Sequence, residues 1–298
     1  MSADDRHTLR RLVRHRGVQI GVAIVALWVL LAALATPLTG YDHSAFDPDT
    51  ALDYQNVPPS WWDRANLPPD VEARTFLAGT DDLGHDMFGL VLYGTRYSLT
   101  IGFLAVAISL LVGIPLGLVS GYFGGWLDTL IMRSIDVVMA FPTILLAICI
   151  VTVLGQSLVN LMVAVGLVGV PGIARQLRAE VLRVKQLEFV QAAQALGFGN
   201  TRILFGHVFP NCLAPIIVLA TLSTATAILE TAGLGFVGLG PEPGTPEWGL
   251  IISENRNLLT QAPWAVLTPG VAIVILVLGF NLLGDGLRDV LDPRLKKR

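Results

Sequence analysis

Charged residues are scarce in this sequence: they make up 14% of its 298 residues, whereas hydrophobic residues make up 53%. Soluble domains carry about 25% charged residues, so the composition excludes an ordinary water-soluble domain. The net charge is −3, and because nucleic acids are bound by basic surfaces, we expect no nucleic-acid partner. The sequence indicates a protein whose main solvent is the lipid bilayer.

The residues that support catalysis or cofactor binding are also few. The chain has three lysines, and none follows a glycine or precedes Ser or Thr, so it lacks the Gly-Lys-Ser/Thr sequence of a phosphate-binding P-loop. The two cysteines and five histidines form no disulfide framework and no metal-ligand cluster. No Ser-His-Asp order, HExxH motif or pair of intramembrane aspartates is present. We therefore expect no catalytic residue, no metal and no cofactor in this chain.

Six long stretches contain no charged residue at all, namely 18–37, 98–120, 137–155, 158–174, 212–229 and 262–284. A membrane-spanning helix needs about 20 mostly apolar residues, so each stretch is predicted to form one span. The third is expected to begin earlier, near Trp126, with Arg133 and Asp136 paired at i, i+3 on one helical face. Proton- or sodium-coupled carriers usually place ionisable residues in mid-span, and these spans have none.

Basic residues concentrate on one side of the predicted spans. All but four of the 20 lie in alternate segments, the exceptions being Arg64, Arg74, Arg96 and Arg256. Because cytoplasmic segments carry the excess of Lys and Arg, both termini are predicted to be cytoplasmic. The predicted segments are a basic N-terminus (1–17), the first span (18–37), an acidic external segment (38–97), a five-helix core (98–287) with a cytoplasmic loop (180–210), and a C-terminus (288–298).

The external segment contains two adjacent tryptophans, Trp61 and Trp62. We expect them at the membrane interface, where tryptophan is enriched, and packing inside a small external cap is the alternative. In the same segment, His85 is expected to do no more than form a hydrogen bond.

A short amphipathic helix is predicted in the cytoplasmic loop. Phe189, Ala192, Ala193 and Leu196 recur at the i, i+3, i+4, i+7 spacing of one helical face, and Gly197 is suited to end the helix. Such a helix can fit a groove on another protein or lie on the lipid surface. We favour docking on protein, because half of the face is alanine and one lysine is near it.

The same segment carries a resemblance. "QAAQALGFGNTRILFGHVFPN" (191–211) resembles the EAA loop of permease subunits of bacterial binding-protein-dependent ABC importers. Ala192, Ala193, Gly197 and Pro210 match the family pattern, and Gln191 replaces its glutamate. The resemblance implies that this helix is the coupling helix that contacts an ATP-binding subunit. The residues it assigns to that contact are Glu188, Phe189, Gln191, Ala192, Ala193, Leu196, Gly197 and Pro210.

Further motifs are similar to the peptide and nickel branch of these importers, over roughly residues 77–297. They are "GTDDLGHD" (79–86), "PEPGTPEWG" (241–249) and "FNLLGDGLRDVLDPRLK" (280–296). The layout is most like the C-type subunit of dipeptide permeases. It implies an all-α, six-span type I permease of the bacterial cytoplasmic (inner) membrane that carries dipeptides or short oligopeptides.

The resemblance also implies the partners: a homologous second permease in a heterodimer, two ATP-binding subunits that bind ATP and magnesium, and an external substrate-binding protein. Nickel chelates, haem or polyamines stay open as alternative cargoes, and a stand-alone secondary transporter or channel is the alternative class.

Glu230 is the one acid that the sequence places within reach of a membrane core, just after the fifth apolar stretch. It is either a carboxylate at the outer interface or a residue that lines the pathway and contacts a peptide amino terminus. Ionisable residues in membrane segments tend to face cavities, which is the reason to consider the second reading.

Overall fold

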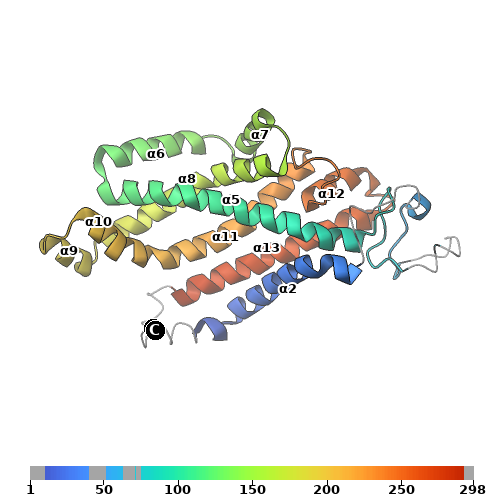
Figure 1. The fold of residues 1–298 in the computed structure, drawn as a ribbon, viewed down its shortest axis with the longest axis horizontal. Helices are drawn as coiled ribbons and strands as arrows, with labels where there is room; N and C mark the ends of the chain where they lie inside the picture. Colours follow the sequence, from blue (N-terminus) through green and yellow to red (C-terminus); the bar gives the residue numbers. More distant parts are fainter. Residues whose placement is uncertain (1–10, 40–51, 63–70, 72–74, 292–298) are drawn as a thin grey trace.

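Within residues 11–39, 52–62, 71 and 75–291, which the computed structural model describes, five helices are long and apolar enough to cross a membrane. They are α2 (Arg16–Thr39), α5 (Met87–Phe123), α8 (Leu158–Lys185), α11 (Phe209–Phe236) and α13 (Pro263–Leu291). They form one elongated bundle (Figure 1). Four of them contain a predicted span completely, and α13 begins one residue after the predicted start at 262, so five of the six predicted spans are confirmed as helices.

The predicted third span is wrong as a single helix. Residues 137–155 are divided between α6 (Gly125–Met139) and α7 (Thr143–Leu154), whose axes meet at 88°. The break lies at Pro142, which has no N–H to donate and which disfavours helical geometry at the residue before it. The two helices together supply a sixth crossing only as a bent pair.

The predicted pairing of Arg133 with Asp136 along α6 is also replaced by a longer-range contact. The Asp136 carboxylate accepts a hydrogen bond from the Arg175 guanidinium of α8, at 2.6 Å. A second pair, Arg178 with Asp128 at 2.6 Å, joins the same two helices. These pairs tie α6 to α8 rather than stabilising α6 internally.

The helices α5 and α8 pack closely along a row of glycines. Gly113, Gly117 and Gly121 of α5 are spaced four residues apart and so share one face. A Cβ atom at Gly117 would lie 2.7 Å from the carbonyl oxygen of Ala174 on α8. Small residues at this spacing let two helix backbones approach within a membrane, so the row fixes the α5–α8 seam.

The first residues of α2 and the last residues of α13 lie toward the end of the bundle that carries α9 (Glu188–Ala195) and α10 (Asn200–Ile203), as Figure 1 shows. The opposite end carries the short helices η2 (Leu52–Tyr54), α12 (Trp248–Asn255) and η4 (Arg256–Leu258). This arrangement agrees with an even number of crossings and with the charge distribution. The remaining parts of the predicted terminal and external segments, 1–10, 40–51, 63–70, 72–74 and 292–298, lie outside the described residues.

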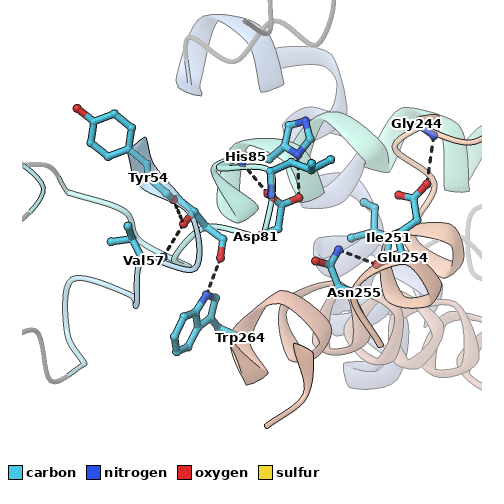
Figure 2. Close-up of polar contacts among 11 residues, drawn as sticks. Tyr54, Val57, Asp81, His85, Gly244, Ile251, Glu254, Asn255 and Trp264 are labelled. Atoms are coloured by element: carbon cyan, nitrogen blue, oxygen red, sulfur yellow. Dashed lines mark hydrogen bonds and ion pairs between the residues drawn. The ribbon is translucent and has the colours of Figure 1, made fainter. Parts of the chain in front are cut away.

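The described part of the external segment packs onto the bundle. The Thr80 hydroxyl donates to the Tyr54 carbonyl and accepts from the Val57 N–H, and the Trp264 indole N–H of α13 donates to the Thr80 carbonyl (Figure 2). By contrast, Trp61 and Trp62 are 71% and 50% exposed. The Trp61 indole N–H donates to the Leu77 carbonyl at 2.8 Å, and the Trp62 ring packs edge-on against Trp264 at 6.1 Å. The position of the two tryptophans at the membrane interface stays a prediction.

Candidate functional site

The cytoplasmic helix α9 has one face buried against its own chain and one face exposed. Val190 and Ala193 are 0% and 5% exposed, whereas Phe189 and Leu196 are 42% and 74% exposed. Ala192 is exposed as well. The predicted helix is confirmed, and it ends just before Gly197. The predicted face is wrong at one position, because Ala193 is turned inward.

The geometry of an α-helix explains this correction. Successive residues advance about 100° around the axis, so Ala193 lies about 40° from Phe189, on the side of Val190. The i, i+4 relation is compatible with either face. The large side chain of Val190 selects the inner one, since burying an aliphatic side chain stabilises by roughly 1.5–3 kcal/mol.

The inner face of α9 joins it to three long helices. Val190 and Ala193 belong to a buried cluster that includes Tyr122 of α5, Val181 of α8 and Cys212 of α11. Close-packed clusters transmit displacement because they have little free volume. A force on the exposed face of α9 therefore acts on α5, α8 and α11 together.

Polar contacts hold the ends of this loop. Lys185 Nζ donates to the Tyr122 carbonyl oxygen at 2.7 Å, and the Tyr122 hydroxyl donates to Asn200 Oδ1 at 3.2 Å. The Gln191 side-chain amide donates to the Gln186 carbonyl at 3.2 Å. Glu188 lies exposed in the first turn of α9. The loop is therefore positioned by its neighbours, and the outer face stays exposed to solvent.

The remaining predicted contact residues lie after α9. Gly197 has φ 78° and its Cβ position would meet nothing within 4 Å. Pro210 is exposed at the start of α11, after a π-helical turn, η3 (Leu204–Val208). Sequence reasoning did not find this turn. π-Turns often lie at functional sites, and no residue pattern in the segment distinguishes one from an α-helix.

A partly open cavity of about 260 Å³ lies where the α6–α7 bend meets the long helices. Its walls come from α5, α8, α11 and the bend between α6 and α7. The contribution of α11 is one helical stripe, made by Leu219, Ser223, Thr226, Ala227 and Glu230. The structure places Glu230 on the wall of this cavity, and its role in the pathway stays a prediction.

Comparison with known proteins identifies the family. Residues 113–297 match the family described as binding-protein-dependent transport system inner membrane component, and residues 6–69 match the N-terminal transmembrane domain of oligopeptide transport permease C. The chain belongs to this family of transport permeases. It is a multi-pass component of the bacterial inner membrane.

Three curated relatives show how far the similarity extends. The permease is 44% identical to the dipeptide transport system permease protein DppC of Alkalihalophilus pseudofirmus, over 98% of this chain and 90% of the relative. It is 41% identical to DppC of Haemophilus influenzae, over 95% and 92%. It is 39% identical to the glutathione transport system permease protein GsiD of Escherichia coli, over 96% and 89%.

A solved structure shares the fold. An inward-facing conformation of the MetNI methionine ABC transporter superposes with a TM-score of 0.59 at 22% identity, covering 68% of this permease and 97% of that chain. The likeness shows that the helical core of the permease has the architecture of an ABC importer.

The external end of the permease contains a buried acid that sequence reasoning missed. Glu247, in the "PEWG" sequence, is 1% exposed, so Glu230 is not the only acid near the membrane core. Its carboxylate accepts the Leu250 N–H at 2.9 Å and caps α12. Burial raises the pKa of Glu247 to about 7 despite the hydrogen bonds from backbone N–H groups and the Ser98 hydroxyl.

The next residue anchors α12 within the permease. Trp248 is fully buried, its indole N–H donates to the Val91 carbonyl oxygen at 2.9 Å, and its ring packs edge-on against Trp28 at 5.2 Å. At Gly94, a Cβ atom would lie 2.1 Å from the Pro246 carbonyl oxygen. These contacts explain the "GTPEWG" motif, because they hold α12 in place among α2, α5 and α11.

His85 forms the hydrogen bond that was expected of it. Its Nδ1 lies 2.7 Å from Asp81 Oδ2, while Asp81 Oδ1 accepts the backbone N–H groups of Leu83 and His85 (Figure 2). Nearby, Glu254 of α12 accepts the Gly244 N–H at 3.2 Å. No group of three His, Cys, Asp or Glu side chains within the described residues could hold a metal ion, and this cluster serves to close the loop before α5.

Proposed function

We propose that this permease imports dipeptides or short oligopeptides across the bacterial inner membrane, as one half of the translocation pathway of an ATP-driven complex. The observation that carries the proposal is the identity of 41–44% over nearly the whole chain to relatives named as dipeptide permeases. The relative that carries glutathione, at 39% identity, also has a short peptide as cargo. Nearly complete coverage means that the segments around the cavity are included in the similarity.

The same proposal assigns the energy source to partners. The chain has no P-loop lysine, and α9 presents Phe189 and Leu196 outward, while its inner face belongs to a buried cluster that includes residues of α5, α8 and α11. We therefore assign ATP and magnesium binding to two partner subunits that contact this face. Their closure would shift the permease between inward- and outward-facing states by favouring one of them.

Two further partners complete the complex. A homologous second permease would form a heterodimer with this chain and close the open side of the pathway. An external substrate-binding protein would deliver the peptide to the end of the bundle that carries α12. The contact residues on α9 and the pathway residue Glu230 are part of this proposal.

The proposal is tested by purifying the tagged permease from its native membrane and identifying the co-purified subunits by mass spectrometry. The complex is then reconstituted in vesicles, and uptake of a labelled dipeptide is measured with and without ATP and binding protein. We expect both partner classes and uptake that needs both additions. Uptake by the purified permease alone, or uptake that an uncoupler abolishes, would indicate a secondary transporter. Preference for a nickel chelate, haem or a polyamine over dipeptides would overturn the assigned cargo.

A further inference from the structure

The cavity beside the α6–α7 bend carries one ionisable side chain. Among its lining residues, Glu230 is the only acid and there is no Lys, Arg or His. The other polar groups that line it are neutral, and they come from Ser109, Thr143, Gln176, Ser223 and Thr226. Among the described residues that line the cavity, Glu230 is therefore the one charged side chain, and it is negative when it is ionised.

The Glu230 carboxylate has no partner that would neutralise it. It forms no hydrogen bond or ion pair with any described residue, and it is neither fully exposed nor fully buried. The Arg175 and Arg178 guanidinium groups, farther along α8 toward the cytoplasmic end, are paired with Asp136 and Asp128. A half-buried carboxylate without a partner favours a cationic ligand, because burial leaves it short of the hydration that it has in water.

The position of Glu230 along the cavity follows from the helix directions. On α11, the lining stripe runs from Leu219 to Glu230, which is about 16 Å at 1.5 Å per residue. Since α11 runs from the α9 end toward the α12 end (Figure 1), Glu230 lies at the external end of the stripe. On α8, which runs in the opposite direction, Gln176 lies toward the cytoplasmic end.

The length of the stripe is suited to a short peptide. An extended chain covers about 3.3–3.6 Å per residue, so about 16 Å corresponds to four or five residues at most. A dipeptide or tripeptide therefore fits along the stripe with its charged amino end at Glu230. The walls offer neutral hydroxyl and amide groups to the peptide bonds and no cation to the carboxyl end.

We infer that the Glu230 carboxylate binds the α-ammonium group of the peptide inside the pathway, so that this permease selects cargo by a free amino terminus. The inference rests on the proposed peptide-import function and adds a recognition step within the membrane to it. The inference also distinguishes the two ends of the peptide. The amino end is recognised, whereas the carboxyl end meets no Lys, Arg or His side chain among the described residues that line the cavity.

The test is a two-by-two comparison in vesicles that contain the complete complex and its binding protein. Wild type and Glu230→Gln are each assayed with a free dipeptide and with the same dipeptide acetylated at its amino terminus. Both complexes use the same binding protein, so its preference between the two peptides affects both equally. The difference that remains measures the coupling between the Glu230 side chain and the peptide amine. For the free dipeptide, we expect Glu230→Gln to lower uptake roughly tenfold to hundredfold, the range for a lost charge-assisted hydrogen bond.

The acetylated peptide should show no further loss in the variant. Glu230→Asp keeps the charge and should retain most uptake, and Glu242→Gln, at an exposed acid that does not line the cavity, should change uptake by less than about twofold. A free dipeptide amidated at its carboxyl end should be as sensitive to Glu230→Gln as the unmodified dipeptide. Equal uptake by wild type and Glu230→Gln, or an equal loss for free and acetylated peptides, would overturn the inference.

The failure of this inference differs from the failure of the proposed function. If the wild-type complex shows no uptake of dipeptides that depends on ATP and binding protein, the proposed function is wrong. If wild-type uptake is normal and Glu230→Gln matches it, only the recognition step is wrong. Where acetylated uptake is too slow to measure even in wild type, the contrast between Glu230→Gln and Glu230→Asp on the free dipeptide decides, and equal rates for the two variants count against the inference.

Discussion

Replacing Phe189 by serine is expected to lower ATP-driven uptake at least about tenfold while the permease still inserts and folds. Phe189 is 42% exposed on the outer face of α9, whereas the fold is held by the opposite face. Removing an aromatic side chain from a protein interface costs roughly 1.5–3 kcal/mol, which corresponds to about tenfold or more in affinity. The measurements are dipeptide uptake and the ATPase activity of the reconstituted complex.

The control for this variant is Phe123→Ser, at an exposed aromatic on α5, at the same end of the bundle. It removes the same side chain from the same end but not from α9. We expect normal coupling in the control and ATP hydrolysis without matching uptake in Phe189→Ser. Normal uptake by Phe189→Ser would mean that the outer face of α9 is not the contact with the ATP-binding subunit.

Phe189 is a better test of coupling than Gly197. The backbone of Gly197 has φ 78°, a conformation that other residues adopt with strain. A bulky residue at position 197 would therefore change the end of α9 even if no partner bound there. A loss of uptake in a Gly197 variant is expected, but it does not separate docking from local distortion.

The second large expected effect is a dependence of the stability of the permease on pH. Burial raises the pKa of Glu247 from its ordinary value of about 4.5 to about 7, so the folded state holds this proton more tightly than the unfolded state. This proton stabilises the fold fully below the pKa that Glu247 has in the unfolded state. The stabilisation is lost as pH rises through the pKa that Glu247 has in the folded state. At 1.36 kcal/mol for each tenfold change, the loss between about pH 4.5 and 7 is about 3 kcal/mol.

Glu247→Gln removes this titration and keeps an oxygen that can accept the Leu250 N–H. We expect the thermal midpoint of the wild-type permease in detergent to fall relative to that of Glu247→Gln as pH rises from 5 to 8. The matched control is Glu242→Gln, at an exposed acid in the same loop, which should follow the wild type. A constant difference between wild type and Glu247→Gln at all pH values would contradict the assignment.

The long apolar stretches of the sequence predicted most of the fold, because a helix needs a minimum length to cross a bilayer. The same reasoning failed at residues 137–155. Their composition is apolar throughout, yet Pro142 cannot donate a backbone hydrogen bond, so the direction of the chain changes there. Proline alone was not decisive, since Pro115, Pro171 and Pro215 lie within continuous helices.

The candidate site was predicted in part. Periodicity placed Phe189 and Leu196 on the exposed face, but it could not place Ala193, because alanine fits either face and the choice depends on Val190 against a distant cluster. Glu247 was missed because its burial depends on contacts with Ser98, 149 residues earlier in the sequence. The presence of Glu230 and Gln176 on the walls of one cavity likewise depends on how two antiparallel helices align.

The central claim is that the outer face of α9 contacts an ATP-binding subunit. A photoreactive residue at position 196, where the side chain is 74% exposed, tests it in the native membrane, with position 190, at 0% exposure, as the control. We predict a cross-link from position 196 to an ATP-binding subunit and none from position 190. Cross-linking of position 196 to lipid alone would contradict the claim.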